Sequence, residues 1–442
     1  MIYLGILLLV FLPIFWFSGS FALYTTDSGA YLLNARELKV PGDRSIFYSV
    51  LIFLITEMQH FVGSSEIVWL VMFQMILTYV LIIQFVRTFF SGINVNFFLL
   101  IFLFLTPVSW MCIQVMPDIF SVTLFLSGLL FLNSTKKWIS ILYGSIVFLS
   151  LVVHNSNVLL FLVFSGGIFL GRNHLAGLKF WKPRFLQLLM VSIFAISSIF
   201  ATNVYANREL SLGVSSEVFF MGKLCENGIL KKYLNKYCNQ EPNPLCAYKD
   251  KLPEHSWDFI WEENGAFANS GGWYESDSLY KKIIRRTLTD PDLLKWHVIE
   301  AGKATAKQIT LIGAGDGIVK LDTNATVVNE LKLMYPTDYK MLVNGSAQQQ
   351  EKIPFSDFNL IYMWFGWISI LAALFFVFIN KQYQQLWMFI LASYFAICNA
   401  FITGAMANVI TRLNTKGITT LIAVSILIIM SQMNPKTKFF RG

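Results

Sequence analysis

A carboxylate and several cationic side chains stand where apolar stretches of this sequence meet polar ones. Asp27 follows the apolar run 1–23, and Arg44 precedes the next apolar run. Arg412 and Lys416 lie at the start of the last one. A carboxylate in such a place accepts a proton from a weak nucleophile such as a hydroxyl, while arginine and lysine hold the negative charge of a phosphate. These residue types therefore suit transfer of a group from a phosphate to a hydroxyl at a membrane boundary.

Each of these residues also has a purely structural interpretation. Asp27 suits the cap of a helix that we expect to begin directly after it. Arg44 is adjacent to Asp43, so that carboxylate or a lipid headgroup is an alternative partner. The two later cations have the character of interfacial anchors, whose charged ends reach water from an apolar helix.

Four further side chains are candidates for the wall of a cavity beside these charges. They are Tyr31, Tyr48, Asp118 and His154. Asp118 follows Pro117 at a predicted helix start, where capping is the favoured alternative. His154 begins the sequence His-Asn-Ser-Asn between two apolar runs, where a structural turn is favoured.

The elements that must position these residues are apolar. The chain has 442 residues, of which 55% are hydrophobic and 14% are charged, so we expect a mainly α-helical integral membrane protein. Stretches of about 17 to 25 apolar residues are candidates for membrane-spanning helices. Ten are predicted, at 1–23, 66–86, 93–111, 117–133, 138–154, 157–171, 185–204, 358–380, 384–404 and 415–432.

The net charge of +8 raises the question of nucleic-acid binding, but membrane topology explains it. Most basic residues outside the long insertion occupy short loops or the tail, without acidic residues, and ten spans place all of these segments on one side. They are Arg87, Lys136, Lys137, Arg172, Lys179, Lys182, Arg184, Lys381, Lys436, Lys438 and Arg441. The positive-inside rule assigns that side, with both termini, to the cytoplasm. We therefore expect no nucleic-acid partner and place the first loop, residues 24–65, outside.

Segment 46–63 leaves this topology open. It is nearly long enough to span, and an eleventh span would put the N-terminus outside and Asp27 on the cytoplasmic side. Its polar end, with Glu57, Gln59 and His60, favours a helix that lies flat at the membrane surface.

The predicted spans leave one long polar insertion. We divide the chain into an N-terminal transmembrane module (1–204), the insertion (205–355) and a C-terminal transmembrane module (356–442). The insertion balances acidic with basic residues, as a water-exposed domain does, and span parity puts it outside. We expect it to be mostly helical. Asp290 followed by proline predicts one helix start, and residues 218–237 predict a second amphipathic helix.

Cysteine usage agrees with an insertion outside the cell. Cys238 and Cys246 flank a turn-rich loop that a disulfide could close. Cys225 is an alternative partner for either. The histidines are few and scattered, and no Cys/His spacing resembles a zinc site. We therefore expect no metal and no cofactor.

Four short motifs resemble those of membrane glycosyltransferases of the GT-C fold. Thr26-Asp27-Ser28-Gly29-Ala30-Tyr31-Leu32 is similar to the family's acidic first-loop signature. Asp43-Arg44-Ser45-Ile46-Phe47-Tyr48 is similar to its Arg-Pro-Pro-Leu-Tyr element, without the two prolines. Met116-Pro117-Asp118 resembles the Pro-Asp pair that opens a span. Ile410-Thr411-Arg412-Leu413 resembles a late Arg-Tyr element, with leucine in place of tyrosine.

The resemblance implies a GT-C-like helical bundle in the plasma or inner membrane, with interfacial helices in the first outer loop. It implies a monosaccharide donor carried on a polyprenyl phosphate and inversion at the sugar C1. The acceptor would be a hydroxyl of an envelope or surface glycan, lipid or protein. Asp27 would be the general base, and Arg44, Arg412 and Lys416 would hold the donor phosphate.

Two other classes of function compete with this one. The first is a non-catalytic transporter or flippase that moves a lipid-linked sugar. Such proteins usually show paired repeats or charges at mid-membrane depth, and the sequence displays neither. The second is a structural subunit of an envelope assembly that docks through the insertion.

Two tryptophans of the insertion, Trp257 and Trp261, lie close to Glu262 and Glu263. Indole rings stack on the apolar faces of pyranoses, so these residues could face a sugar. Burial in a domain core is the favoured interpretation, because tryptophan contributes a large apolar surface to such cores.

Overall fold

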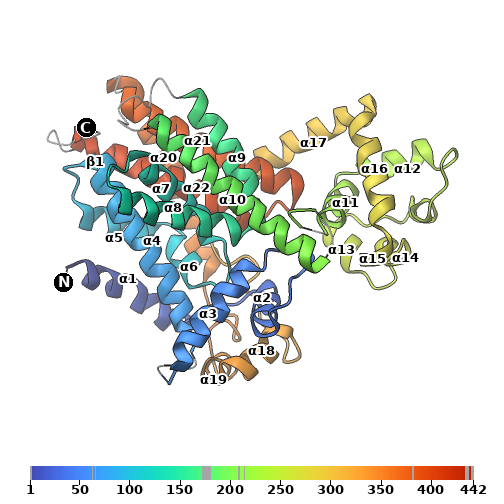
Figure 1. Ribbon diagram of the computed structural model, residues 1–442, viewed down its shortest axis with the longest axis horizontal. Coiled ribbons are helices and arrows are strands. Elements are labelled where there is room, and N and C mark those ends of the chain that lie inside the picture. Colours follow the sequence, from blue (N-terminus) through green and yellow to red (C-terminus); the bar gives the residue numbers. More distant parts are fainter. Residues whose placement is uncertain are drawn as a thin grey trace.

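The computed structural model describes residues 2–61, 63–64, 66–171, 181–207, 210–213, 215–380, 383–433 and 438–439. These residues are mainly helical, with one antiparallel pair of short strands, β1 (Phe90–Ser91) and β2 (Lys438–Phe439). Figure 1 shows a large helical bundle with a smaller lobe beside it. A group of shorter helices lies at one end of the bundle: α2 (Thr26–Glu37), α3 (Phe47–Phe61), α18 (Thr326–Met334) and α19 (Pro336–Val343).

Helices of the bundle coincide with the predicted apolar stretches. They are α1 (Ile2–Ser18), α4 (Val68–Phe89), α5 (Val95–Leu105), α6 (Val108–Ile113), α7 (Ile119–Asn133), α8 (Lys137–Val152), α9 (Asn155–Leu170), α10 (Trp181–Asn207), α20 (Phe355–Asn380), α21 (Tyr383–Met406) and α22 (Thr411–Met433). Within the described residues, α4, α10, α20, α21 and α22 are long and apolar enough to cross a membrane. The protein is therefore an α-helical membrane protein, while the number of crossings stays a prediction.

The predicted stretch 93–111 is broken into α5 and α6. Thr106 is extended at the break, with φ −132° and ψ 159°, and Pro107 follows it. Proline lacks an N–H and disfavours helical dihedrals in the residue before it, so one continuous helix cannot form there.

The segment that leads to Asp27 is fixed against the segment that leads to Asp118. The N–H of Leu23 donates to the carbonyl of Ile113 at 3.0 Å, and the N–H of Val115 donates to the carbonyl of Leu23 at 3.0 Å. These backbone hydrogen bonds bring two distant parts of the sequence to the same end of the bundle.

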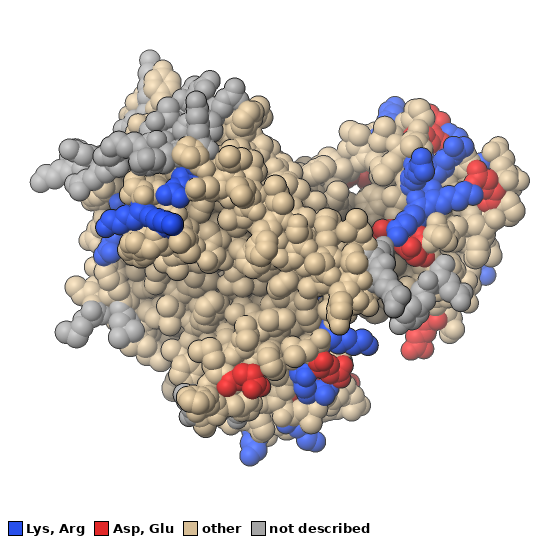
Figure 2. Space-filling view, in the orientation of Figure 1, with Lys and Arg blue, Asp and Glu red and all other residues tan. Residues whose placement is uncertain are grey.

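The charged residues separate along the bundle. Figure 2 shows a broad uncharged surface over the bundle, with charged side chains at its ends and on the smaller lobe. Lys137 begins α8 directly after the C-terminal end of α7, and Arg184 donates to the carbonyl of Ser134 there. Asp118 lies at the opposite end of α7. Of the predicted inner basic residues, Arg172, Lys179, Lys381, Lys436 and Arg441 lie outside the described residues.

The first half of the insertion forms the smaller lobe. It contains α11 (Ser216–Glu226), α12 (Ile229–Tyr237), the 3₁₀ helix η1 (Pro244–Tyr248), α13 (Ser256–Trp261), α14 (Ala266–Asn269), α15 (Gly272–Glu275) and α16 (Asp277–Thr289). Its own apolar core includes Met221, Leu234 and Tyr280. The helix predicted over 218–237 is two helices, because Gly228 has φ +69° and turns the chain between them. A disulfide joins Cys238 to Cys246, and Cys225 is a buried free thiol.

The second half of the insertion belongs to the core of the bundle. α17 (Pro291–Thr310) begins at Asp290, whose Oδ1 accepts from the N–H of Asp292 at 3.0 Å, as a capping aspartate does. After α17 the chain contributes Ile312, Leu321 and Leu331 to the bundle core. α18 (Thr326–Met334) and α19 (Pro336–Val343) follow, and α18 packs on α2 (Thr26–Glu37).

Segment 46–63 forms α3 (Phe47–Phe61), which is shorter than a usual membrane span. Its Ser49 hydroxyl donates to the carbonyl of Tyr31 at 2.9 Å, and its Thr56 hydroxyl contacts the hydroxyl of Tyr335. Met58 and Phe61 are exposed. Polar contacts on one face and exposed apolar side chains on the other favour a helix at the membrane surface.

Helices α2 and α18 approach each other closely at Gly29. A Cβ at this position would lie 2.5 Å from the backbone nitrogen of Val327. We expect Gly29→Ala to lower the free energy of unfolding by about 1–3 kcal/mol, because the backbone of α18 has to move away. Thermal unfolding of the detergent-solubilised protein measures the change.

Gly302→Ala is the matched control, because Gly302 is also helical and a Cβ there would meet nothing within 4 Å. Alanine is the better helix former, so this variant should keep or raise the unfolding temperature. Equal behaviour of the two variants would contradict the tight crossing of α2 and α18.

Asp338 of α19 is a buried carboxylate with incomplete hydrogen bonding. Its Oδ2 accepts from the N–H of Ile67 at 2.9 Å, and its Oδ1 is buried with no hydrogen-bond partner among the described residues. Burial, reinforced by the nearby charge of Glu66, raises the pKa of Asp338 to about 6. The pKa of Asp338 is therefore higher in the folded than in the unfolded protein. Its contribution to the free energy of unfolding is favourable at low pH and is lost as the pH rises through about 6.

We therefore expect Asp338→Asn to stabilise the protein above pH 6, by about 1–3 kcal/mol, and to leave it nearly unchanged near pH 4. Unfolding temperatures of the wild type and the variant, measured between pH 4.5 and 8, should diverge as pH rises. Parallel curves would show that the carboxylate carries no such penalty.

Candidate functional site

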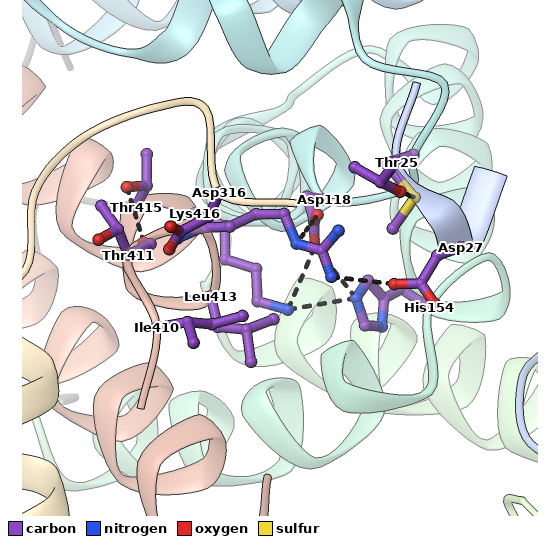
Figure 3. Close-up of polar contacts among 12 residues, drawn as sticks. Thr25, Asp27, Asp118, His154, Asp316, Ile410, Thr411, Leu413, Thr415 and Lys416 are labelled. Atoms are coloured by element: carbon purple, nitrogen blue, oxygen red, sulfur yellow. Dashed lines mark hydrogen bonds and ion pairs between the residues drawn. The ribbon is translucent and has the colours of Figure 1, made fainter. Parts of the chain in front are cut away.

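Asp27 lies between two guanidinium groups at the end of the bundle. It occupies the first turn of α2, and its Oδ2 accepts a hydrogen bond from Arg412 at 3.1 Å. Its Oδ1 is 3.5 Å from Nη2 of Arg44. Figure 3 shows the Asp27 carboxylate facing this cluster of charged side chains. The capping interpretation of Asp27 is wrong, because α2 begins at Thr26 after Thr25 as its cap residue.

A second carboxylate, Asp118, forms the buried centre of the cluster. It lies 3.4 Å from Nε2 of His154, 3.6 Å from Nζ of Lys416 and 3.6 Å from Nε of Arg412. Its side chain is only 2% exposed. Asp118 immediately precedes α7, but no backbone N–H of this helix donates to its carboxylate, so the interpretation of its side chain as a cap is also wrong. Asp118 instead balances three neighbouring basic groups in a site with little water.

The first turns of α22 deliver both cations to this cluster. Arg412 and Lys416 are four residues apart, so they project from the same face of a helix. Lys416 is almost fully buried, and its Nζ lies 3.2 Å from both Nε2 of His154 and Oγ of Ser156. The interpretation of these two residues as anchors that reach water is therefore not met by the structure.

A glycine-rich loop, residues 313–317, packs against α22 and supplies a residue that the sequence analysis did not select. Oδ2 of Asp316 accepts from the backbone N–H of Arg412 at 3.1 Å. Gly317 has φ +77°, and a Cβ there would lie 3.5 Å from Nη1 of Arg412. An acidic residue within a run of glycines was the available signal for this contact.

The two tyrosines have different positions. Tyr31 lies beneath Arg44, whose guanidinium carbon is 5.0 Å from the ring centroid, a distance typical of a cation–π contact. Tyr48 packs edge-on against Tyr31 at 5.0 Å, is fully buried, and donates its hydroxyl to Gln74 at 2.9 Å. The prediction that Tyr48 lines a cavity is thus wrong, because its polar group is used inside the core.

Arg44 is held as a cation. Its Nη2 lies 2.5 Å from Asp43 and its Nη1 donates to the carbonyl of Asp27 at 3.2 Å. Burial lowers the pKa of Arg44, but the hydrogen bond to Asp43 and the negative charges of Asp43 and Asp27 outweigh this effect, so the pKa is raised overall. The pairing with Asp43 that we considered as an alternative is present, and it occurs together with the contact to Asp27.

A cavity of about 540 Å³ lies beside the cluster. Its polar wall contains Asp43, His154, Ser156 and Lys416. Its apolar wall comes from α9, α11, α16, α21 and α22, and includes Leu159, Phe219, Leu288, Ile402 and Leu413. The cavity therefore offers the cation of Lys416 to an anionic group and apolar surface to a hydrocarbon chain.

The structure thus brings Asp27, Arg44, Arg412, Lys416, Asp118, His154 and Tyr31 together, and it adds Asp43, Ser156 and Asp316. Among the described residues, no group of three His, Cys, Asp or Glu side chains is placed to hold a metal ion.

No model of a known protein family matches this chain, and searches of characterised proteins and of solved structures also find no match.

Proposed function

We propose that this protein is a membrane glycosyltransferase that moves a monosaccharide from a polyprenyl phosphate to a hydroxyl group. One observation carries the proposal: a partly exposed carboxylate lies between two arginines, beside a cavity that is lined by Lys416 and by apolar side chains. A lipid-linked phosphate needs both kinds of wall. A hydroxyl nucleophile needs the carboxylate.

In the proposed reaction the acceptor oxygen bonds to C1 of the sugar as the bond from C1 to the phosphate oxygen breaks. The proton of the acceptor hydroxyl passes to Asp27. The bonding electrons leave with the phosphate, which becomes a polyprenyl phosphate monoester. Attack opposite the leaving group inverts C1, and Arg44 and Arg412 stabilise the charge that develops on the phosphate.

The contacts of Asp27 suggest how donor binding prepares the base. In the donor-free arrangement the two carboxylate oxygens of Asp27 face Arg44 and Arg412, so both are engaged in ion pairs. A donor phosphate competes for the same guanidinium groups because it accepts two hydrogen bonds from each arginine. Its binding would release Asp27 to act as a base only when the donor is present.

We also propose the sidedness that the basic loops predict. The cluster lies at the opposite end of α7 from Lys137, so a cytoplasmic basic rim places the site on the outer face. The acceptor is then an envelope or surface glycan, lipid or protein. An introduced Ala30→Cys, tested with an impermeant thiol reagent on intact cells, should react from outside.

The test of the activity uses purified protein in lipid nanodiscs with polyprenyl-phosphate sugars labelled in the sugar. We expect free polyprenyl phosphate and a labelled product when a membrane extract of the host supplies the acceptor. Donor that remains intact with every common hexose and N-acetylhexosamine would overturn the proposal.

A transporter remains the second candidate because of the buried charges. Asp118 and Lys416 are both almost fully buried, and such residues in membrane proteins often carry protons or bind transported solutes. A transporter would move the labelled donor across a sealed vesicle without cleaving it. The same labelled donor therefore separates the two functions.

A further inference from the structure

Three tryptophans are exposed on the surface of the smaller lobe. Trp257, Trp261 and Trp273 have exposed fractions of 49%, 57% and 38%, so the core interpretation of the first two is wrong. The ring centroids of Trp261 and Trp273 are 5.5 Å apart at an angle of 49°. Trp273 is fixed from behind by Phe267, a buried core residue 5.0 Å away. We call Trp257, Trp261 and Trp273 the tryptophan surface.

The tryptophan surface is continuous with the cavity beside the charge cluster. Trp273 contacts Phe219, with 6.1 Å between ring centroids, and Phe219 lines that cavity. The helix that carries Trp257 and Trp261 is also fixed near the cluster. Its Ser256 hydroxyl contacts Oδ1 of Asn408 at 2.7 Å, only a few residues before Arg412. A chain of sugars on the tryptophan surface would therefore extend toward the ion cluster.

The charge around these rings favours carbohydrate over a membrane surface. Asp258, Glu262 and Glu263 are exposed beside the tryptophans and form no ion pair within the described part of the chain. Carboxylates accept hydrogen bonds from sugar hydroxyls. They also repel anionic lipid headgroups, which attract basic side chains instead. Indole rings next to free carboxylates are thus suited to a neutral pyranose.

We propose that the tryptophan surface binds a neutral oligosaccharide, which is the acceptor of the transfer reaction. Trp261 and Trp273 stack on the apolar faces of pyranose rings, and the neighbouring carboxylates accept hydrogen bonds from their hydroxyls. The acceptor role rests on the proposed function, whereas the binding of sugar does not. The end of a glycan bound here would reach the cavity beside Phe219, which contacts Trp273 and lines the cavity.

The test measures binding of soluble tetrasaccharides to the full-length protein by saturation-transfer NMR and by calorimetry. Maltotetraose, cellotetraose, mannotetraose and chitotetraose form the panel. The protein is held in lipid nanodiscs, because maltoside detergents are themselves pyranosides. We expect at least one tetrasaccharide to bind, and Trp261→Ala or Trp273→Ala to weaken it about tenfold, as expected for one lost aromatic contact.

Trp364→Ala is the matched control, since Trp364 is 60% exposed but lies on α20 of the bundle. It should leave the affinity unchanged. No binding by any member of the panel, or equal affinity of all the variants, would overturn the proposal. Quenching of Trp261 and Trp273 fluorescence by brominated lipid would also overturn it, in favour of membrane docking.

Asp27→Asn separates this inference from the proposed function. The variant should bind the tetrasaccharide with unchanged affinity, because Asp27 belongs to the ion cluster and the tryptophan surface does not include it. Sugar binding in a protein that never cleaves the donor would support the tryptophan surface while the transferase proposal failed.

Discussion

Asp27→Asn is expected to lower sugar transfer by about 10²–10⁴-fold, which is the range for loss of a general base. Asparagine has the shape of aspartate and still accepts a hydrogen bond from Arg412, but it takes no proton from the acceptor hydroxyl. Formation of labelled product from a polyprenyl-phosphate sugar measures the loss. Donor binding should be retained or strengthened, because the phosphate no longer competes with a carboxylate for the two arginines.

Folding should be preserved in this variant. The Asp27 side chain is 33% exposed, so its ion pairs are partly solvated and their removal has a small effect on stability. Asp357→Asn is the matched control: Asp357 is an exposed carboxylate in the first turn of α20, and among the described residues it forms no ion pair with the cluster. It should transfer sugar at the wild-type rate. Full activity of Asp27→Asn would remove Asp27 from the mechanism.

The helices of the bundle were predictable because apolar length is a local property. Each predicted span is helical, and the one that differs, 93–111, breaks at Pro107, whose effect on the residue before it is also local. The helix start at Asp290 was predictable for the same reason, since capping involves residues only two or three positions apart. Local rules therefore recovered most elements.

The partner of each element was not predictable in this way. The insertion was predicted as one outer domain, yet its second half packs α18 on α2 and contributes Leu331 to the bundle core. An amphipathic pattern shows that a helix has a buried face and does not show what covers it. Trp261 shows the opposite error: its apolar side chain was expected in a domain core, but it is exposed.

The candidate site was partly predictable for a similar reason. Asp27, Arg44 and Arg412 were grouped because each stands at the same predicted boundary, and the structure brings them into contact. Asp118 was interpreted as a cap, because proline before a helix start is a local signal. Its actual partner Lys416 lies about three hundred residues later in the chain. No spacing rule connects residues that only the packing of α7 against α22 brings together.

That contact leads to the second large expected effect, which concerns stability. Asp118→Asn should lower the free energy of unfolding by about 3–5 kcal/mol, because it leaves Lys416 buried without its carboxylate and leaves Arg412 with one anion fewer. Reduced unfolding temperature and reduced yield of folded protein would measure this. The loss should exceed that of Asp27→Asn, whose carboxylate is partly exposed.

A double variant tests whether the buried charge itself is the cause. Asp118→Asn combined with Lys416→Met removes both members of the pair, and methionine fills a volume similar to that of the lysine stem. Replacing both members of a buried ion pair with uncharged groups often changes the free energy of unfolding little. Removing only one member lowers it strongly. The double variant should therefore be more stable than Asp118→Asn alone, a non-additivity of about 1–3 kcal/mol. Additive losses would mean that the effect of Asp118→Asn does not arise from its pairing with Lys416.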